Sequence, residues 1–210
     1  MPGTLTQRSL LRATRTLAAG DPSIAASVER FGPPPLWARE PTFATLVHLI
    51  LEQQVSLESA LAAFGRLHVA LGGVVTPDAF LALDAGTLRT VGFSRQKAGY
   101  ARDLAVALAD DFDLSSLERL PDDDVRRELT RLRGVGRWTA DVFLTMCLLR
   151  PDVWPHGDRA LVTGATEVLE LQARPTLDEL HATAERWRPY RSVAARILWH
   201  HYLGVRGRSD

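Results

Sequence analysis

Apolar residues recur along this chain at intervals of three and four, which is the spacing of one face of an α-helix. Leu10, Ala13 and Leu17 show the pattern near the N-terminus, and residues 43–50 show it most strongly. The alternation typical of a strand does not appear, apart from a few β-branched residues at 74–75. The pattern therefore predicts an all-α protein.

Capping residues and breakers set the expected limits of the helices. Asp21 followed by Pro22 is typical of a helix start, because aspartate caps the first turn and proline fits the first helical position. Three consecutive prolines at 33–35 indicate a stiff connector. The predicted helices are 10–20, 22–32, 42–53, 56–71, a short one from 76, 94–108, 121–132, 137–149, 159–171, 176–186 and 190–202.

Charge is balanced over the whole chain but not along it. The 210 residues include 25 Lys and Arg against 25 Asp and Glu, so the formal net charge is zero. A general polycation that coats nucleic acid is excluded, and any such binding needs a local patch. Arginines gather in two segments: Arg126, Arg127, Arg131, Arg133 and Arg137, then Arg186, Arg188, Arg191 and Arg196. A solvated helix face is the alternative interpretation of each cluster.

Cysteine, histidine and hydropathy narrow the class of protein further. The single cysteine, Cys147, lies in an apolar helical stretch and is expected to be buried. One thiolate cannot hold an iron–sulfur cluster, and the six histidines show no metal-ligand spacing, so we expect no catalytic transition metal. No apolar run approaches the roughly 20 residues of a membrane helix. Residues 1–20 do not resemble a signal peptide, so we expect a soluble, cytoplasmic protein.

The most informative short motif is the Gly-Val-Gly turn at 134–136, between two predicted helices. Without side chains at Gly134 and Gly136, backbone N–H groups can approach an anion closely. Arg137 opens the next helix, whose N-terminal dipole favours negative charge. Such a turn suits a nucleic-acid phosphate, although an ordinary tight turn has the same three letters.

The longer string LRGVGRWTADVFLTMCLLRPDVWPHGD, at 132–158, resembles the helix-hairpin-helix plus Gly/Pro-Asp signature of the HhH-GPD superfamily of DNA glycosylases. The stretches FATLVHLILEQQVS (43–56), GFSRQKAGYARDLA (92–105) and WRPYRSVAARILWHHY (187–202) resemble its alkylation-repair branch, the DNA-3-methyladenine glycosylase II type. The likeness covers most of residues 43–202.

The resemblance implies two helical lobes with a DNA- and base-binding cleft between them. One lobe is residues 42–152 and ends in the hairpin, whereas the other combines 1–41 with 153–210 and carries Asp158 at the interface. It also implies a monofunctional glycosylase of base excision repair, acting as a monomer on double-stranded DNA. Alkylated bases of the 3-methyladenine and 7-methylguanine type would be flipped out and hydrolysed off, leaving an abasic site.

In this resemblance, Asp158 is the catalytic carboxylate. Breaking an N-glycosidic bond develops positive charge on the sugar, and a carboxylate stabilises that charge or orients water to attack it. An aspartate before a helix is also a common cap, and Asp158 can do both.

Trp138 suggests that the reaction stops at base removal. Relatives that also cut the backbone use a lysine just after the hairpin glycines as a Schiff-base nucleophile. This chain has Trp138 there, and its one lysine, Lys97, lies in another segment. An indole also suits a cationic methylated base, although simple core packing is the alternative.

Other residues of the base pocket follow from the helix and from the family. Asp141 and Val142 share a helix face with the tryptophan. Asp141 could contact a cationic base or hold an arginine, and the sequence leaves both open. Family members use an aromatic of the WRPYRS region, for which Trp187 and Tyr190 are candidates, whereas Trp199 is expected in the core.

The expected DNA contacts lie in three segments. Gln54 matches the family's plug, which fills the gap left by a flipped base. Ser94 is an expected N-cap, with Arg95 and Lys97 close enough to meet a phosphate. The remaining expected contacts are Gln53, Arg133, Gly134, Val135, Gly136, Arg137 and Thr139. The family also implies a Na⁺ or K⁺ ion at the backbone carbonyls of Thr130, Leu132 and Val135, and no other cofactor.

Two other classes of function remain open at this point. One is a glycosylase for oxidised or mismatched bases, against whose commonest forms the missing lysine and cysteines argue. The other is a non-catalytic helical protein that keeps only the hairpin, against which the presence of Asp158 argues.

Overall fold

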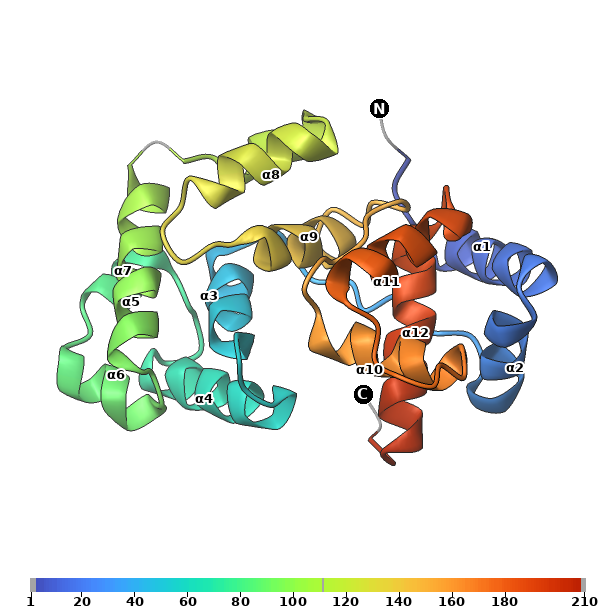
Figure 1. The fold of residues 1–210 in the computed structure, drawn as a ribbon. Helices are drawn as coiled ribbons and strands as arrows, with labels where there is room; N and C mark the ends of the chain where they lie inside the picture. Colours follow the sequence, from blue (N-terminus) through green and yellow to red (C-terminus); the bar gives the residue numbers. More distant parts are fainter. Residues whose placement is uncertain (1–2, 111, 209–210) are drawn as a thin grey trace. The chain divides into compact units, whose positions relative to one another are not determined.

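The computed structural model describes residues 3–110 and 112–208 (Figure 1). These residues form α-helices and two short 3-10 helices joined by loops, with no strand among them, which confirms the all-α prediction. None of the helices in the described ranges is long and apolar enough to cross a membrane.

Two compact units divide the chain. Unit 1 joins residues 1–38 to 144–210, and unit 2 is residues 39–143. The second division falls within α9 (Arg137–Met146), nine residues before the boundary drawn from the sequence after residue 152.

Residues 144–152 belong to unit 1 because their backbone is bonded to it. The Leu5 N–H donates to the Leu149 carbonyl at 2.8 Å, and the Ser192 N–H donates to the Pro151 carbonyl at 3.0 Å. Sequence patterns place the end of a helix but not the partner of the loop that follows it.

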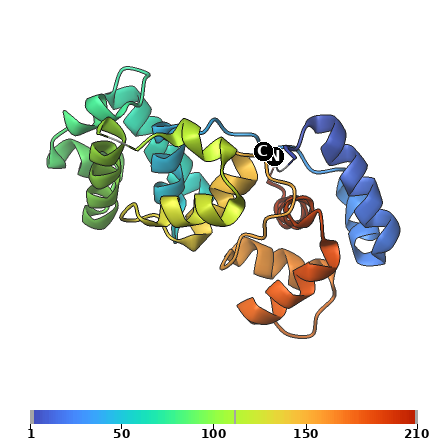
Figure 2. The same cartoon turned by 90° about the horizontal axis from the view of Figure 1, so that it is seen from above.

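Unit 1 is built around its last helix, α12, which appears almost end-on in Figure 2. The helices α1, α2 and α10 pack against α12. At Gly164 the backbone of α10 comes so close to α12 that an added Cβ would lie 2.5 Å from the Leu198 carbonyl oxygen. The elements are α1 (Gln7–Gly20), α2 (Pro22–Phe31), α10 (Arg159–Val168), α11 (Leu177–Ala184), η2 (Glu185–Trp187) and α12 (Arg191–Val205).

Unit 2 packs around α3, whose apolar side chains are almost all buried. An edge-to-face series of Phe43, Phe80 and Phe93 joins α3 to α5 and to the start of α7. The elements are α3 (Phe43–Glu52), α4 (Leu57–Ala70), α5 (Pro77–Leu81), α6 (Ala85–Val91), α7 (Arg95–Ala109), η1 (Leu114–Arg119), α8 (Asp122–Thr130) and the first part of α9.

The predicted caps are confirmed, whereas two short elements were not predicted. Side-chain oxygens cap the helices at the expected positions Asp21, Ser56, Thr76, Ser94 and Asp158, and Thr42 also caps α3. The apolar spacing did not reveal α6 and η1, because each of these helices buries only two side chains. Two such positions cannot establish a helical repeat.

Candidate nucleic-acid interface and active site

The Gly-Val-Gly turn of unit 2 joins α8 to α9 and is built for close backbone approach. Gly134 has φ +86°, and a Cβ there would lie 2.3 Å from Cγ of Tyr100, so only glycine fits. Gly136 has open space around it. Within the described part of the chain, the N–H groups of Gly134 and Gly136 donate to no protein acceptor. Both groups are therefore available to an anion beside the N-terminus of α9.

Gln53 braces this turn from within the protein. Its Nε2 donates to the Gly134 carbonyl at 2.8 Å and to Oγ1 of Thr139 at 3.1 Å. Thr139 is only 1% exposed, and Val135 is also buried. The side chains of Gln53 and Thr139 thus bond to each other and that of Val135 packs inside unit 2, so a DNA contact predicted at these residues cannot come from these side chains.

Lys97 also has a role different from the predicted one. Its ammonium donates to the carbonyls of Leu51 and Gln53, each at 2.7 Å, so it bonds to the C-terminal end of α3 rather than pointing to solvent. Burial lowers the pKa of this lysine. Ser94 caps α7 as expected, and Arg95 is exposed and without a partner in the described ranges. Of these residues, Arg95 remains the candidate for a phosphate contact.

Gln54, the expected plug, lies in the short turn between α3 and α4. Its side chain is exposed, and its φ of +59° is in the left-handed region that non-glycine residues rarely adopt. Strained residues of this kind persist where the surrounding structure holds them, and they are common at sites that bind ligands. Val55 and Leu57, next along the turn, are also about half exposed.

The arginines around the hairpin are partly neutralised by carboxylates. Arg133 donates to Asp103 at 2.8 Å and lies over the Tyr100 ring, and Nε of Arg137 is 3.5 Å from Asp141. Both arginines are exposed, so they can exchange these partners for a phosphate. The positive patch is therefore weaker than a count of arginines suggests.

Asp141 resolves the alternative that the sequence left open. Its carboxylate is fully buried and accepts a 2.6 Å bond from Nε of Arg126. Val142, beside it, is also buried. Asp141 therefore holds an arginine, and the base-pocket role suggested for these two residues does not fit their burial. Trp138, one turn earlier, is half-buried.

Asp158 begins α10 in unit 1, and its carboxylate is oriented by two donors. Oδ1 accepts the Leu161 N–H at 2.9 Å and the indole N–H of Trp199 at 3.2 Å. Trp199 lies in the core of unit 1 as predicted, but its bond to Asp158 is not predictable from any local sequence pattern. Only the packing of α10 on α12 brings residues 41 positions apart together.

Trp187 is the clearest correction to the predicted base pocket. Its ring is 1% exposed and packs against Trp154 at a centroid distance of 5.7 Å. Its indole N–H donates to Asp21 at 2.9 Å. A flipped base cannot reach a side chain buried in this way, so Tyr190, which is half-buried, is the remaining candidate of the two.

The second arginine cluster is not a free basic patch. Arg196 is fully buried and donates to the carbonyls of Leu36, Ser192 and Thr145 at 2.6–3.1 Å. Burial lowers its pKa to about 10. The other three form ion pairs with carboxylates: Arg186 with Asp21, Arg188 with Asp152 and Glu185, and Arg191 with the same two acids. This cluster stabilises unit 1 and does not offer an array of free cations.

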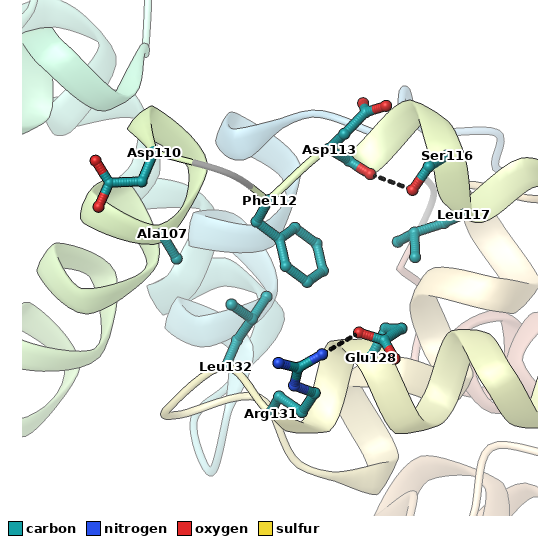
Figure 3. A pocket seen from close by; sticks show the side chains of 9 residues that line it. All are labelled: Ala107, Asp110, Phe112, Asp113, Ser116, Leu117, Glu128, Arg131 and Leu132. Atoms are coloured by element: carbon teal, nitrogen blue, oxygen red, sulfur yellow. Dashed lines mark hydrogen bonds and ion pairs between the residues drawn. The ribbon is translucent and has the colours of Figure 1, made fainter.

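A hollow of about 570 Å³ lies in unit 2 (Figure 3). The ring of Phe112 points into it, and three acidic residues, Asp110, Asp113 and Glu128, belong to its lining. The one basic residue of the lining, Arg131, is paired with Glu128 at 2.7 Å. This lining, with more acidic than basic residues, gives no support for a phosphate site in the hollow. Its residues are Ala107, Asp110, Phe112, Asp113, Ser116, Leu117, Glu128, Arg131 and Leu132.

Comparison with protein families identifies the family to which the chain belongs. The model described as "HhH-GPD superfamily base excision DNA repair protein" matches residues 47–189, which is more than half of the chain. The chain belongs to the HhH-GPD superfamily. The match contains the hairpin and the Gln53-Gln54 turn of unit 2, and Asp158 of unit 1.

Similar proteins narrow the branch of this HhH-GPD chain. The putative DNA-3-methyladenine glycosylase YfjP of Bacillus subtilis is 29% identical over 185 residues, with 84% of this chain and 64% of YfjP covered. DNA-3-methyladenine glycosylase 1 of Schizosaccharomyces pombe is 29% identical, with 77% and 72% covered. This chain therefore spans just under two thirds of the length of YfjP.

A solved structure gives the same affiliation at the level of the fold. The 3-methyladenine DNA glycosylase Mag1 of Schizosaccharomyces pombe, solved in complex with abasic-DNA, superposes on this HhH-GPD protein with a TM-score of 0.80 at 28% identity. The superposition covers 90% of this chain and 95% of Mag1.

Proposed function

We propose that this HhH-GPD protein is a monofunctional DNA glycosylase that removes alkylated bases of the 3-methyladenine and 7-methylguanine type. It hydrolyses the N-glycosidic bond and leaves an abasic site. The observation that carries the proposal is the carboxylate of Asp158, held by two N–H donors in a chain whose relatives are named 3-methyladenine glycosylases.

Asp158 would act on the charge that develops at the sugar. When the base leaves, the sugar becomes an oxocarbenium-like cation, and a nearby carboxylate stabilises it or orients the attacking water. The bonds from Leu161 and Trp199 fix Oδ1, and with it the plane of the carboxylate. A group oriented in advance stabilises the transition state without the cost of reorganisation.

The hairpin would supply grip on the duplex without reading its sequence. The N–H groups of Gly134 and Gly136, with the positive end of α9, suit a phosphate oxygen. Fixing a phosphate fixes the attached sugar, which is how binding energy is converted into alignment for the reaction. A Na⁺ or K⁺ ion at the carbonyls of Thr130, Leu132 and Val135 belongs to this proposal, since carbonyl oxygens suit such hard cations.

The side chains support cleavage without a lyase step. The only lysine, Lys97, already donates to two carbonyls of unit 2, and the position after the hairpin glycines is Trp138. A half-buried indole at the start of α9 can stack on the cationic ring of a methylated purine.

The proposed partner is double-stranded DNA that contains alkylated bases, bound by a monomer of this chain in the cytoplasm. Mag1, which resembles this chain over nearly its whole length, was solved with abasic-DNA, the product of such a reaction.

Incubation of the protein with methylated duplex DNA, followed by chromatography of the released bases, tests the proposal. We expect free 3-methyladenine and 7-methylguanine and an intact strand that breaks only after alkali or heat. Release of oxidised bases instead would move the protein to another branch, and a covalent adduct trapped with borohydride would exclude the monofunctional mechanism. Absence of any release would exclude a glycosylase.

A further inference from the structure

One face of α7 contacts both segments of unit 2 that would bind DNA in the proposed function, namely the Gln54 turn and the hairpin. Lys97, Tyr100 and Asp103 follow each other at intervals of three, so they lie along one side of the helix. Lys97 bonds to the chain just before the Gln54 turn. Tyr100 and Asp103 contact the hairpin.

Lys97 fixes the start of the turn that carries Gln54. Its two bonds go to the carbonyls of Leu51 and Gln53, at the C-terminal end of α3. An ammonium at this end satisfies carbonyls that the helix leaves without partners, and it complements the negative end of the helix dipole. Bonds from a charged donor are also about twice as strong as neutral ones.

Gln53 passes this constraint on to the hairpin. Its backbone carbonyl accepts from Lys97, while its side-chain amide donates to the Gly134 carbonyl and to Thr139. The residue directly before Gln54 is thus bonded on one side to α7 and on the other to the phosphate-binding turn.

The hairpin is held against the same helix by two further contacts. The Tyr100 ring lies so close to Gly134 that no side chain fits between them, and Asp103 accepts a 2.8 Å bond from Arg133. The hairpin and the Gln54 turn are therefore both fastened to α7, although 80 residues separate Gln54 from Gly134.

We infer that Lys97 and Gln53 are positioning residues for base flipping. They hold the Gln54 turn at a fixed distance and angle from the Gly134 turn. When the Gly134 turn binds a phosphate, the Gln54 side chain is then placed to fill the gap left by the flipped base. The same bonds hold Gln54 in its strained backbone conformation. This inference rests on the proposed function, because it presumes that a base is flipped.

The inference differs measurably from a direct phosphate contact by Lys97. A lysine that neutralises a phosphate contributes about −0.9 to the slope of log K against log salt. A positioning residue does not change this slope. It instead changes the ratio of two affinities, that for a DNA site where the plug can insert and that for undamaged duplex. An abasic-site analogue offers such a site, and undamaged duplex does not.

The test measures both quantities for Lys97→Met, with Arg95→Met as the matched variant. Arg95 lies two residues away, is exposed and has no protein partner in the described ranges, so its loss should flatten the salt slope by about 0.9 and keep the preference for the abasic analogue. For Lys97→Met we expect the wild-type slope and a loss of preference of about tenfold, the factor for a hydrogen bond to a charged group. A flattened slope with the preference intact would overturn the inference.

Gln53→Ala provides a second, independent variant, since it removes the bonds to the hairpin without changing any charge. We expect the same loss of preference, together with a smaller change in the fluorescence of 2-aminopurine placed beside the analogue. Thermal unfolding of each variant shows whether it is folded. If one variant is not folded, the binding preference of the other variant tests the inference. If both folded variants keep the wild-type preference, the inference fails. If the wild type itself has no preference and releases no base, the proposed function fails.

Discussion

The hairpin of unit 2 and the Asp158 corner of unit 1 hold their working groups in opposite ways. The hairpin presents backbone N–H groups, and the side chains of Gln53 and Tyr100 fix the path of its main chain. Asp158 presents a side chain, which backbone and indole N–H groups orient. Binding through backbone groups should survive the replacement of nearby side chains, provided that the turn keeps its shape. A reaction that depends on one carboxylate should be lost when that side chain is replaced, and also when the backbone that positions it moves.

Loss of the Asp158 charge should give the largest effect. Asp158→Asn keeps the shape but removes the negative charge, so we expect single-turnover base release to fall by about 10²–10³-fold, the scale for loss of an electrostatic stabiliser. Affinity for DNA should remain close to wild type, because the hairpin is unchanged. A variant that still cleaves at the wild-type rate would show that the two regions do not divide binding and reaction as described.

A change in the shape of the hairpin should instead affect stability and binding together. Gly134→Ala adds a Cβ where φ is +86° and the Tyr100 ring is 2.3 Å away, so we expect a loss of about 2–4 kcal/mol in the free energy of unfolding. Gly136→Ala is the matched control, with no positive φ and no neighbour within 4 Å, and should change stability by less than about 1 kcal/mol. Denaturant unfolding of both variants measures the difference, and equal losses would contradict this account of the turn.

Trp199 tests how far orientation of the carboxylate matters. Trp199→Phe keeps an aromatic ring in the core, removes the N–H donor to Asp158 and makes the buried side chain smaller, so unfolding is measured alongside base release. We expect base release to slow by about tenfold, since the lost bond goes to a charged group. DNA affinity should not change, which separates this variant from one that disturbs the hairpin. A release rate equal to that of the wild type would reduce Trp199 to a core residue.

The smallest effect is expected for the exposed arginines of the hairpin. Replacing Arg133 and Arg137 together by Gln should flatten the slope of log K against log salt by at most about 1.8, or 0.9 for each phosphate contact. Asp103 and Asp141 already share these cations, so we expect less than this limit. An unchanged slope would place the DNA on another face of unit 2.

The sequence predicted local structure well because caps and apolar spacing act over a few residues. Asp21 and Ser94 illustrate this, since each caps the helix that it was expected to cap. The destinations of long side chains were not predictable in the same way. The sequence suggests that Lys97 contacts DNA and that Trp187 contacts the base. In the structure, Lys97 instead donates to two carbonyls and Trp187 packs against another indole ring, all far away in sequence. Such partners exist only once the helices have packed.

The candidate site shows the same limit. The hairpin and Asp158 were recognisable because their residues are close together in sequence and follow the family signature. The bond from Trp199 and the brace from Gln53 link residues 41 to 86 positions apart. No local pattern encodes these links, because they depend on which helices come to lie side by side.

Arg196 has a consequence for how unit 1 responds to acid. It ties the connector at Leu36 to α12 and to the end of α9 through peptide carbonyls alone, and these acceptors do not titrate. The nearby pairs of Glu185 differ, because hydrogen bonding from Arg188 lowers the pKa of Glu185. Their contribution to stability is present above the ordinary pKa of a glutamate and is lost as the pH falls through the lowered value. Acid should therefore weaken the pairs of Glu185 with Arg188 and Arg191, whereas the bonds from Arg196 to the connector are unaffected.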